Sequence, residues 1–166
     1  MPRLALFTAT EIFIDANIFL YVINDNLRFG APCHELVAKI ERGEVEGYTS
    51  HFVVSEIVHK MMQHETCQRF DLPLAQAVSF LKRNPRVISS LHAYRDALNL
   101  IYNLPNLTLL EIDNAILRQS HAMIRDDQLL STDALHAATC VAYDIPHFAT
   151  NDKDFTRVKQ LTIWSP

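Results

Sequence analysis

The stretch Ile12–Asn17, with the sequence IFIDAN, decides the fold class of this chain. Its first three residues are β-prone and apolar on both faces, as a strand buried inside a parallel sheet requires. Asp15 ends this run abruptly, and an acid that closes a buried apolar strand seldom helps folding. Asn17 can cap a helix over residues 18–23. The stretch therefore predicts a buried strand with an acid at its carboxyl end.

Strands and helices alternate along the rest of the chain. Further strands are predicted at Tyr48-Thr49, Val87-Ile88, Leu107–Leu110, His147–Ala149 and Leu161–Trp164. Helices are predicted to begin at Pro32, Ser50, Asp71–Pro73, Ser89-Ser90, Asp113 and Ser131. Such alternation favours an α/β protein with a mainly parallel central sheet covered by helices on both faces. Because the 166 residues show no linker and no repeat, we expect a single domain, residues 1–166.

Four acids occupy related positions in this pattern. Asp15 directly follows a strand and Asp152 comes shortly after another, whereas Glu56 and Asp133 lie near the starts of helices that follow strands. Ligands of such sheets bind outside the carboxyl ends of the strands, where these helices also begin. The sequence therefore predicts that four carboxylates from distant parts of the chain converge on one small region.

A divalent metal gives a physical reason for this convergence. Carboxylates that lie close together repel one another, and Mg²⁺ or Mn²⁺ resolves the conflict because both ions prefer carboxylate and water oxygens. This arrangement suits phosphodiester hydrolysis. Three of the acids also have a structural interpretation: Asp133 can favour the positive end of its helix, Asp152 can be a helix N-cap, and Glu56 can pair with Lys60. Taken as an ordered set, the acids favour the functional interpretation.

The sequence resembles the PIN-domain family, in particular the VapC-type toxins of toxin–antitoxin pairs. The resemblance extends from Glu11 to Trp164 and is carried by four segments, Ile12–Asn17, Ser55–Ile57, Ser131–Ala138 and Ala149–Phe155. It implies a three-layer α/β/α fold and an endoribonuclease, a hydrolase that depends on Mg²⁺ or Mn²⁺. By this resemblance the catalytic and metal-binding acids are Asp15, Glu56, Asp133 and Asp152.

The resemblance also assigns supporting residues and partners. Asn17, Thr150 and Asn151 fall where the family has polar residues beside the first and last acids, and Asp154 is expected to be structural. RNA is the implied substrate, a small antitoxin the implied partner, and a homodimer the implied assembly. The chain departs from the compact toxins in its longer interval between Glu56 and Asp133, with an extra helical part around residues 85–104.

Composition excludes several other classes. The three glycines, Gly30, Gly43 and Gly47, do not have the spacing of a phosphate-binding loop. The net charge of −4 gives no global attraction to nucleic acid, although four acids gathered around a metal would leave the remaining charges balanced. Three isolated cysteines and the lack of a long apolar run predict a soluble cytoplasmic protein with no membrane association.

Two further features have open interpretations. The basic cluster Lys82–Arg86, followed by Arg95, is either a solvated helix end or a contact to RNA phosphates. His136 is one helical turn after Asp133 and can border the site, but we expect it to pack or to support a ligand residue rather than to bind a ligand itself.

Two functions compete with the nuclease. One is a PIN-type RNA- or protein-binding module without nuclease activity. The other is a haloacid-dehalogenase-like phosphatase, which also places an aspartate after its first strand but needs a second one two residues later. Asn17 occupies that position here, which argues against the phosphatase.

Overall fold

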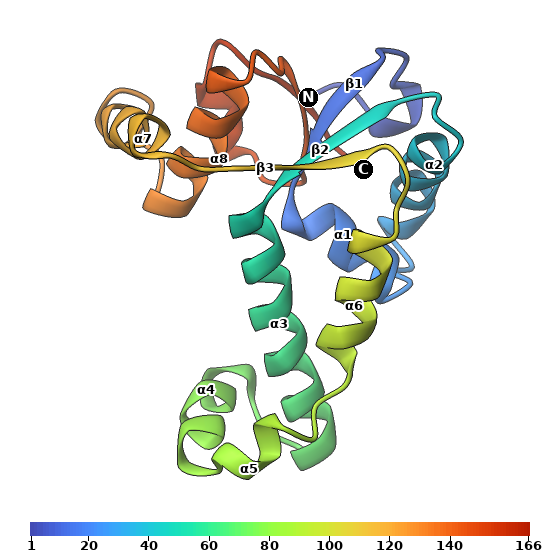
Figure 1. Cartoon of the computed structure of the whole chain (residues 1–166), viewed down its shortest axis with the longest axis vertical. Coiled ribbons are helices and arrows are strands. Elements are labelled where there is room, and N and C mark those ends of the chain that lie inside the picture. The colour runs from blue at the N-terminus through green and yellow to red at the C-terminus, as the bar shows by residue number, and fades with distance from the viewer. The chain divides into compact units, whose positions relative to one another are not determined.

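A computed structural model describes residues 1–166, which fall into two units (Figure 1). The sheet unit comprises Met1–Val53 and Leu104–Pro166, and the helical unit comprises Val54–Asn103. The expectation that residues 1–166 form a single domain stays a prediction.

Five parallel strands form the sheet of the sheet unit, in the order β3-β2-β1-β4-β5. Their bounds are β1 Glu11–Ile14, β2 Glu46–Ser50, β3 Leu107–Leu110, β4 His147–Ala149 and β5 Thr162–Trp164. In the central strand, Phe13 pairs with Tyr48 on one side and with Phe148 on the other. The rings of Phe13 and Phe148 stack with their centroids 5.2 Å apart, and both are fully buried. The apolar strands predicted from the sequence are therefore confirmed as the core of a parallel sheet.

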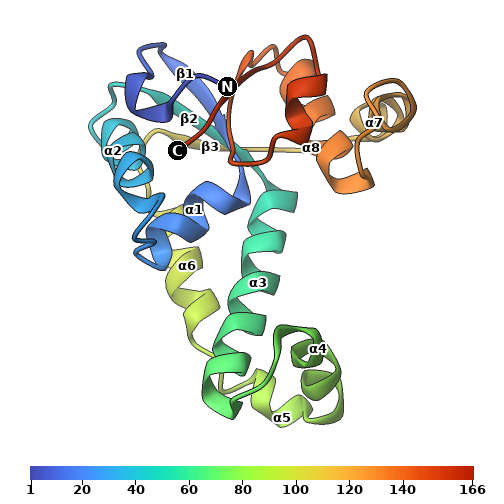
Figure 2. The ribbon, with the colours of Figure 1, turned by 180° about the vertical axis from the view of Figure 1, so that it is seen from behind.

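Helices cover both faces of this sheet. The chain passes from β1 to β2 through α1 (Ala16–Ile23) and α2 (Gly30–Glu41), and from β3 to β4 through α7 (Asn114–Asp126) and α8 (Ser131–Ala142). The two connections run in opposite directions across the sheet, so right-handed crossovers place them on opposite faces. Figures 1 and 2 show α2 and α8 on opposite sides of the strands. The predicted three-layer α/β/α fold is confirmed.

The helical unit contains four helices. They are α3 (His51–Phe70), which begins in the sheet unit directly after β2, α4 (Leu74–Arg83), α5 (Pro85–Ile88) and α6 (Ala93–Tyr102). Within this unit α6 lies beside α3, and α4 and α5 lie at the carboxyl end of α3 (Figures 1 and 2). Glu65 of α3 accepts hydrogen bonds from the backbone N–H groups of His92 (2.8 Å) and Ala93 (2.9 Å). A carboxylate from a neighbouring helix thus caps the start of α6.

Three local predictions are wrong. Val87 and Ile88 are helical rather than extended, because Pro85 at the first position of α5 has a φ suited to a helix start. Ser89 and Ser90 do not cap α6, since their hydroxyls donate to the carbonyls of Arg86 and Val87 in α5.

The third error concerns the start of α1. Asp15, not Asn17, is the N-cap of this helix, because its carboxylate accepts from the backbone N–H of Ala16. None of the helices in the chain combines the length and the apolar character needed to cross a bilayer.

Candidate active site

The carboxyl ends of β1 and β4 define the candidate site. These strands are neighbours in the sheet although more than 130 residues separate them in the chain. The chain leaves β1 through α1 and reaches β4 through α8, on the opposite face of the sheet. The ends of β1 and β4 therefore form the point at which the strand order reverses, where open α/β sheets bind their ligands. Asp15 directly follows β1 and Thr150 directly follows β4.

Asp15 is a buried carboxylate with an ordered set of donors. Only 7% of the residue is exposed. Its Oδ1 accepts from the backbone N–H of Ala16 at 2.7 Å, and its Oδ2 accepts from the hydroxyl of Thr150 at 2.6 Å and from the side-chain amide of Asn17. Hydrogen bonds to an ionised acceptor are among the stronger ones in proteins. The orientation of the Asp15 carboxylate is therefore fixed by neighbours on both strand ends.

Thr150 connects the two strand ends. Its hydroxyl donates to Asp15 and accepts from the Asn17 amide (2.8 Å) and from the backbone N–H of Asp152 (3.0 Å). A hydroxyl offers one donor and two acceptor positions, so all three are used. The Asn17 side-chain oxygen in turn accepts from the backbone N–H of Asn151 at 3.2 Å. The structure thus brings Asp15, Asn17 and Thr150 into one network, which the sequence alone did not describe.

Asn151 contributes to this network through its backbone. Its side-chain amide donates to the hydroxyl of Tyr21 in α1 at 3.0 Å, so the side chain bonds to α1 rather than to Asp15. We infer that this side chain fixes the loop after β4.

His136 lies one helical turn after Asp133, where we expect a packing or supporting residue beside the site. It is buried in α8, with its ring 6.4 Å from that of Phe13 and 5.9 Å from that of Phe52, centroid to centroid. One of its ring nitrogens also lies within 4.8 Å of a carboxylate oxygen of Asp15, so the two side chains can share one metal ion. The ring therefore packs as expected, and it can in addition serve as a metal ligand.

Cys140 lies on the same face of α8 as His136. It lies four residues after His136 and is fully buried. Burial raises the pKa of its thiol, and the negative charge of Asp15 raises it further. The thiol therefore stays protonated.

The other predicted acids have different surroundings. Asp133 lies in the first turn of α8 and is half-buried. Asp152 is exposed, and its Oδ1 accepts from the backbone N–H of Asp154 at 2.8 Å. The expectation that Asp152 is a helix N-cap is wrong, because Lys153 is the N-cap of the short 3-10 helix Asp154–Arg157. Glu56 lies in α3, in the helical unit, with a side chain that is 24% exposed and an ion pair to Lys60 at 2.6 Å, as the structural interpretation predicted. The convergence of all four acids stays a prediction.

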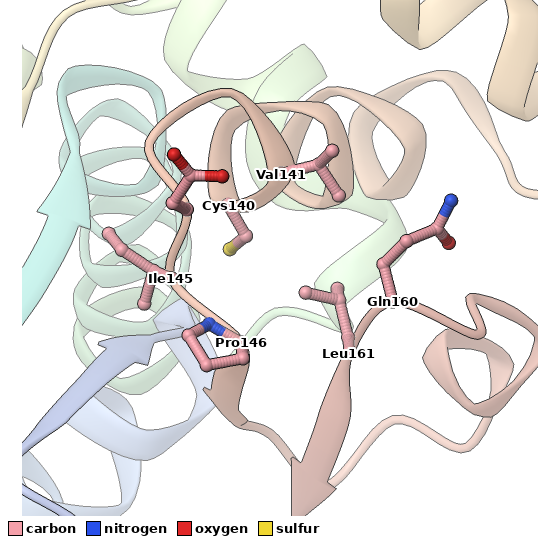
Figure 3. A pocket seen from close by; sticks show the side chains of 7 residues that line it. Cys140, Val141, Ile145, Pro146, Gln160 and Leu161 are labelled. Atoms are coloured by element: carbon pink, nitrogen blue, oxygen red, sulfur yellow. The ribbon is translucent and has the colours of Figure 1, made fainter.

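A pocket lies at the amino ends of the strands (Figure 3), whereas Asp15 lies at their carboxyl ends. It has a volume of about 190 Å³ and is lined by Cys140, Val141, Asp144, Ile145, Pro146, Gln160 and Leu161. Some of these residues lie in or just after the last turn of α8, and the others directly precede β4 or β5. The pocket therefore opens at the amino ends of these strands. It is mostly apolar and does not include Asp15. It is therefore separate from the candidate site.

Comparison with known proteins identifies the family. The family model described as PIN domain matches residues 12–161, and the chain belongs to this family. One curated relative, Ribonuclease VapC2 of Methanocaldococcus jannaschii, is 28% identical over 155 residues, which cover 92% of both chains. The recognition made on sequence segments is confirmed.

Solved structures share the fold. One is VapC20 of Mycobacterium tuberculosis, described as a sarcin-ricin loop cleaving toxin, with a TM-score of 0.59 and 16% identity over 89% of this chain and 95% of the other. Another is VapBC2 of Rickettsia felis bound to a DNA fragment from its promoter, with a TM-score of 0.57 and 15% identity over 94% and 98% of the two chains. At these identities the likeness concerns the fold alone.

Proposed function

We propose that this chain is a metal-dependent endoribonuclease that hydrolyses phosphodiester bonds in RNA. The observation that carries the proposal is the buried Asp15 carboxylate at the strand-order reversal, held by Ala16, Asn17 and Thr150. Membership of the PIN domain family and the similarity to a protein named a ribonuclease support it. Hydrolysis by a metal-activated water needs no side-chain nucleophile.

The donor atoms at the site suit a divalent ion. A carboxylate oxygen of Asp15 lies within 4.8 Å of a ring nitrogen of His136. Mn²⁺ can bind both atoms because it accepts oxygen and nitrogen ligands, whereas Mg²⁺ would bind the Asp15 oxygen. A bound ion of this kind lowers the pKa of water and stabilises negative charge on phosphate oxygens. The protein's own contribution is to hold Asp15 in one orientation through Thr150 and Asn17.

The remaining acids enter the proposal by their positions. Asp133 is three residues before His136 on α8, so the two side chains share one face of that helix. Glu56 belongs to α3, which begins directly after the carboxyl end of β2. Asp152 follows β4 by three residues and donates its backbone N–H to Thr150. We propose that these three acids complete the metal site.

We also propose a partner and an assembly. Similar structures include VapBC2 of Rickettsia felis and a toxin–antitoxin complex from Klebsiella pneumoniae, which supports a small antitoxin as partner of this chain. A homodimer is proposed from the resemblance to VapC-type toxins. Its test is the mass in solution, which should be twice 19.0 kDa. Three free cysteines agree with a reducing cytoplasm as the proposed location.

The decisive experiment is Mn²⁺-dependent cleavage of a mixed RNA pool by the wild type and by Asp15→Asn. We expect cleavage by the wild type and its loss in the variant. Asp144→Asn is the matched control, because Asp144 is exposed and its positive φ of 55° suits asparagine. Binding of RNA without cleavage would favour a PIN-type binding module. Turnover of a fluorogenic phosphatase substrate without RNA cleavage would favour the haloacid-dehalogenase-like alternative.

A further inference from the structure

The region between α4 and α6 carries positive charge that the site described above does not use. Residues 72–95 contain Lys82, Arg83, Arg86 and Arg95 but no aspartate or glutamate, whereas the whole chain has a net charge of −4. All four basic residues are exposed. We call these four residues the basic turn.

The charge of the basic turn is not neutralised by carboxylates. The ion pairs of the helical unit join Glu56 to Lys60 and Glu65 to Arg69 instead. The hydrogen bonds of the basic turn go to neutral oxygens: Arg83 donates to the carbonyl of Ser79 at 3.2 Å, and Arg95 donates to the carbonyl of Ser89 at 3.4 Å. These guanidinium groups are oriented by the protein while their charge stays available to an anion.

Helix-end electrostatics accounts for only half of the basic turn. Lys82 and Arg83 are the last two residues of α4, where cations interact favourably with the helix dipole. Arg95, in contrast, lies in the first turn of α6, where a positive charge is unfavourable. Arg86 belongs to α5, whose four residues give little dipole. Helix-end electrostatics therefore leaves Arg86 unexplained, whereas Arg95 is held by the Tyr94 hydroxyl and the Ser89 carbonyl and is followed by Asp96 in the same turn.

The basic turn is held together by local hydrogen bonds. The hydroxyl of Ser89 donates to the carbonyl of Arg86 at 2.8 Å, and the carbonyl of Ser89 accepts from Arg95. Arg69 of α3 fixes the same segment by donating to the carbonyl of Ser90 at 2.9 Å. The backbone that carries the cations is thus ordered, which lowers the entropic cost of binding an extended anion.

We propose that the basic turn binds the phosphate backbone of single-stranded RNA. This inference rests on the proposed nuclease function, which supplies RNA as the polyanion that the chain meets. Contacts of this kind position a nucleic acid without selecting its sequence. Because the basic turn and Asp15 belong to one chain, RNA that is bound to the basic turn has a high effective concentration for the site at Asp15. The basic turn therefore increases the affinity for long RNA and not the rate of the chemical step.

Fluorescence anisotropy tests the binding directly. The probe is a fluorescein-labelled oligouridylate of about 20 nucleotides in EDTA, titrated at several KCl concentrations, with the triple variant Lys82→Gln, Arg83→Gln and Arg86→Gln. Each phosphate contact to a single strand contributes about 0.7 to the slope of log K against log salt. We expect the variant to lose about 2 from this slope and to bind about tenfold or more weakly at low salt.

Two control proteins make the result specific. A second triple variant, Arg28→Gln, Arg118→Gln and Lys159→Gln, changes the net charge equally at exposed positions of the sheet unit. An exchange variant, Lys82→Arg, Arg83→Lys and Arg86→Lys, keeps the charge of the basic turn and should bind as the wild type does. Equal losses in the two Gln triples would overturn the proposal, because net charge alone would then explain them. Urea unfolding verifies that every variant is folded.

Kinetics separate this proposal from the nuclease assignment. For the long oligonucleotide, the Lys82, Arg83 and Arg86 triple variant should raise KM and leave kcat unchanged, and for a tetranucleotide it should change neither. If the wild type cleaves no RNA, the proposed function fails, and the anisotropy result still decides the basic turn. If the triple variant keeps its RNA affinity but loses binding to a polyglutamate peptide, the partner is an acidic protein and the RNA proposal is overturned.

Discussion

Replacing Thr150 by valine removes one hydroxyl and keeps the shape of the side chain. The wild-type hydroxyl donates to Asp15 at 2.6 Å and accepts from Asn17 at 2.8 Å and from the Asp152 backbone at 3.0 Å. Thr150→Val therefore takes one donor from a buried carboxylate and leaves two N–H groups without this acceptor. A hydrogen bond to a charged group contributes about 1.5–3 kcal/mol, so we expect the free energy of unfolding to fall by about 2–3 kcal/mol.

The same substitution should reduce activity more than stability alone explains. Without the Thr150 hydroxyl, the Asp15 carboxylate can rotate about its side-chain torsions, and a displacement of about 1 Å at a reacting centre can cost about 100-fold in rate. Urea titration measures the stability, and single-turnover cleavage at saturating Mn²⁺, at a temperature where the variant is folded, measures the chemical step.

Two matched variants complete the test. Thr150→Ser keeps the hydroxyl and should retain most of the stability and cleavage. Thr139→Val removes a fully buried hydroxyl that donates only to the carbonyl of Leu135 in α8. This control should cost about 1 kcal/mol and leave cleavage unchanged. Wild-type cleavage by Thr150→Val, or a stability loss no larger than that of Thr139→Val, would refute the role of Thr150 in holding Asp15.

Three further outcomes are expected. Mn²⁺ at about 100 times its dissociation constant should raise the free energy of unfolding by about 2.7 kcal/mol in the wild type and by much less in Asp15→Asn, as measured by urea titration. Burial opposes ionisation of Glu65, but two backbone N–H donors and a guanidinium together hold its pKa below the usual range. This carboxylate therefore stabilises the fold above its unfolded-state pKa, and the stabilisation is lost as the pH falls through the lower folded-state pKa. The difference in urea midpoint between the wild type and Glu65→Gln should consequently shrink from neutral pH to about pH 3. Burial raises the pKa of Cys33 to about 12 and that of Cys140 well above its ordinary value, so iodoacetamide at about pH 8 should modify only Cys67 in the native protein, and mass spectrometry should find all three modified after unfolding.

The central strands β1 and β4 could be predicted from the sequence because they are buried on both faces, whereas Thr108 of the edge strand β3 is exposed. Residues 12–14, 107–110 and 147–149 form short apolar runs bounded by polar residues, and each run is a strand. Val87-Ile88 has the same local character but follows Asn84-Pro85, and there the proline starts a helical turn. Two residues provide too short a run for propensity to outweigh such a neighbour. The wrong strand prediction therefore lies where a proline competes with a short β-prone run.

The structural and functional interpretations of the acids are not alternatives at every position. Asp15 caps α1 through Oδ1 and bonds to Thr150 through Oδ2, so one carboxylate serves the helix and the site together. Asp152 uses Oδ1 for a turn contact, yet a carboxylate has about four lone-pair positions. The turn contact of Asp152 therefore does not argue against metal binding. At Asp15 and Asp152, a structural role and a functional role are therefore compatible.

His136 shows why part of the site was beyond the reach of pattern analysis. Residues 134–140 of α8 are all buried, so the helix has no polar stripe that identifies the face toward the sheet. The remaining signal is spacing: Asp133, His136 and Cys140 are three and four residues apart and therefore lie on one face. That face could be assigned to the site only once Asp15 had been placed, because a His136 ring nitrogen is then found near its carboxylate. A helix buried on all sides thus hides its functional face from the sequence, and a partner from another element is needed to find it.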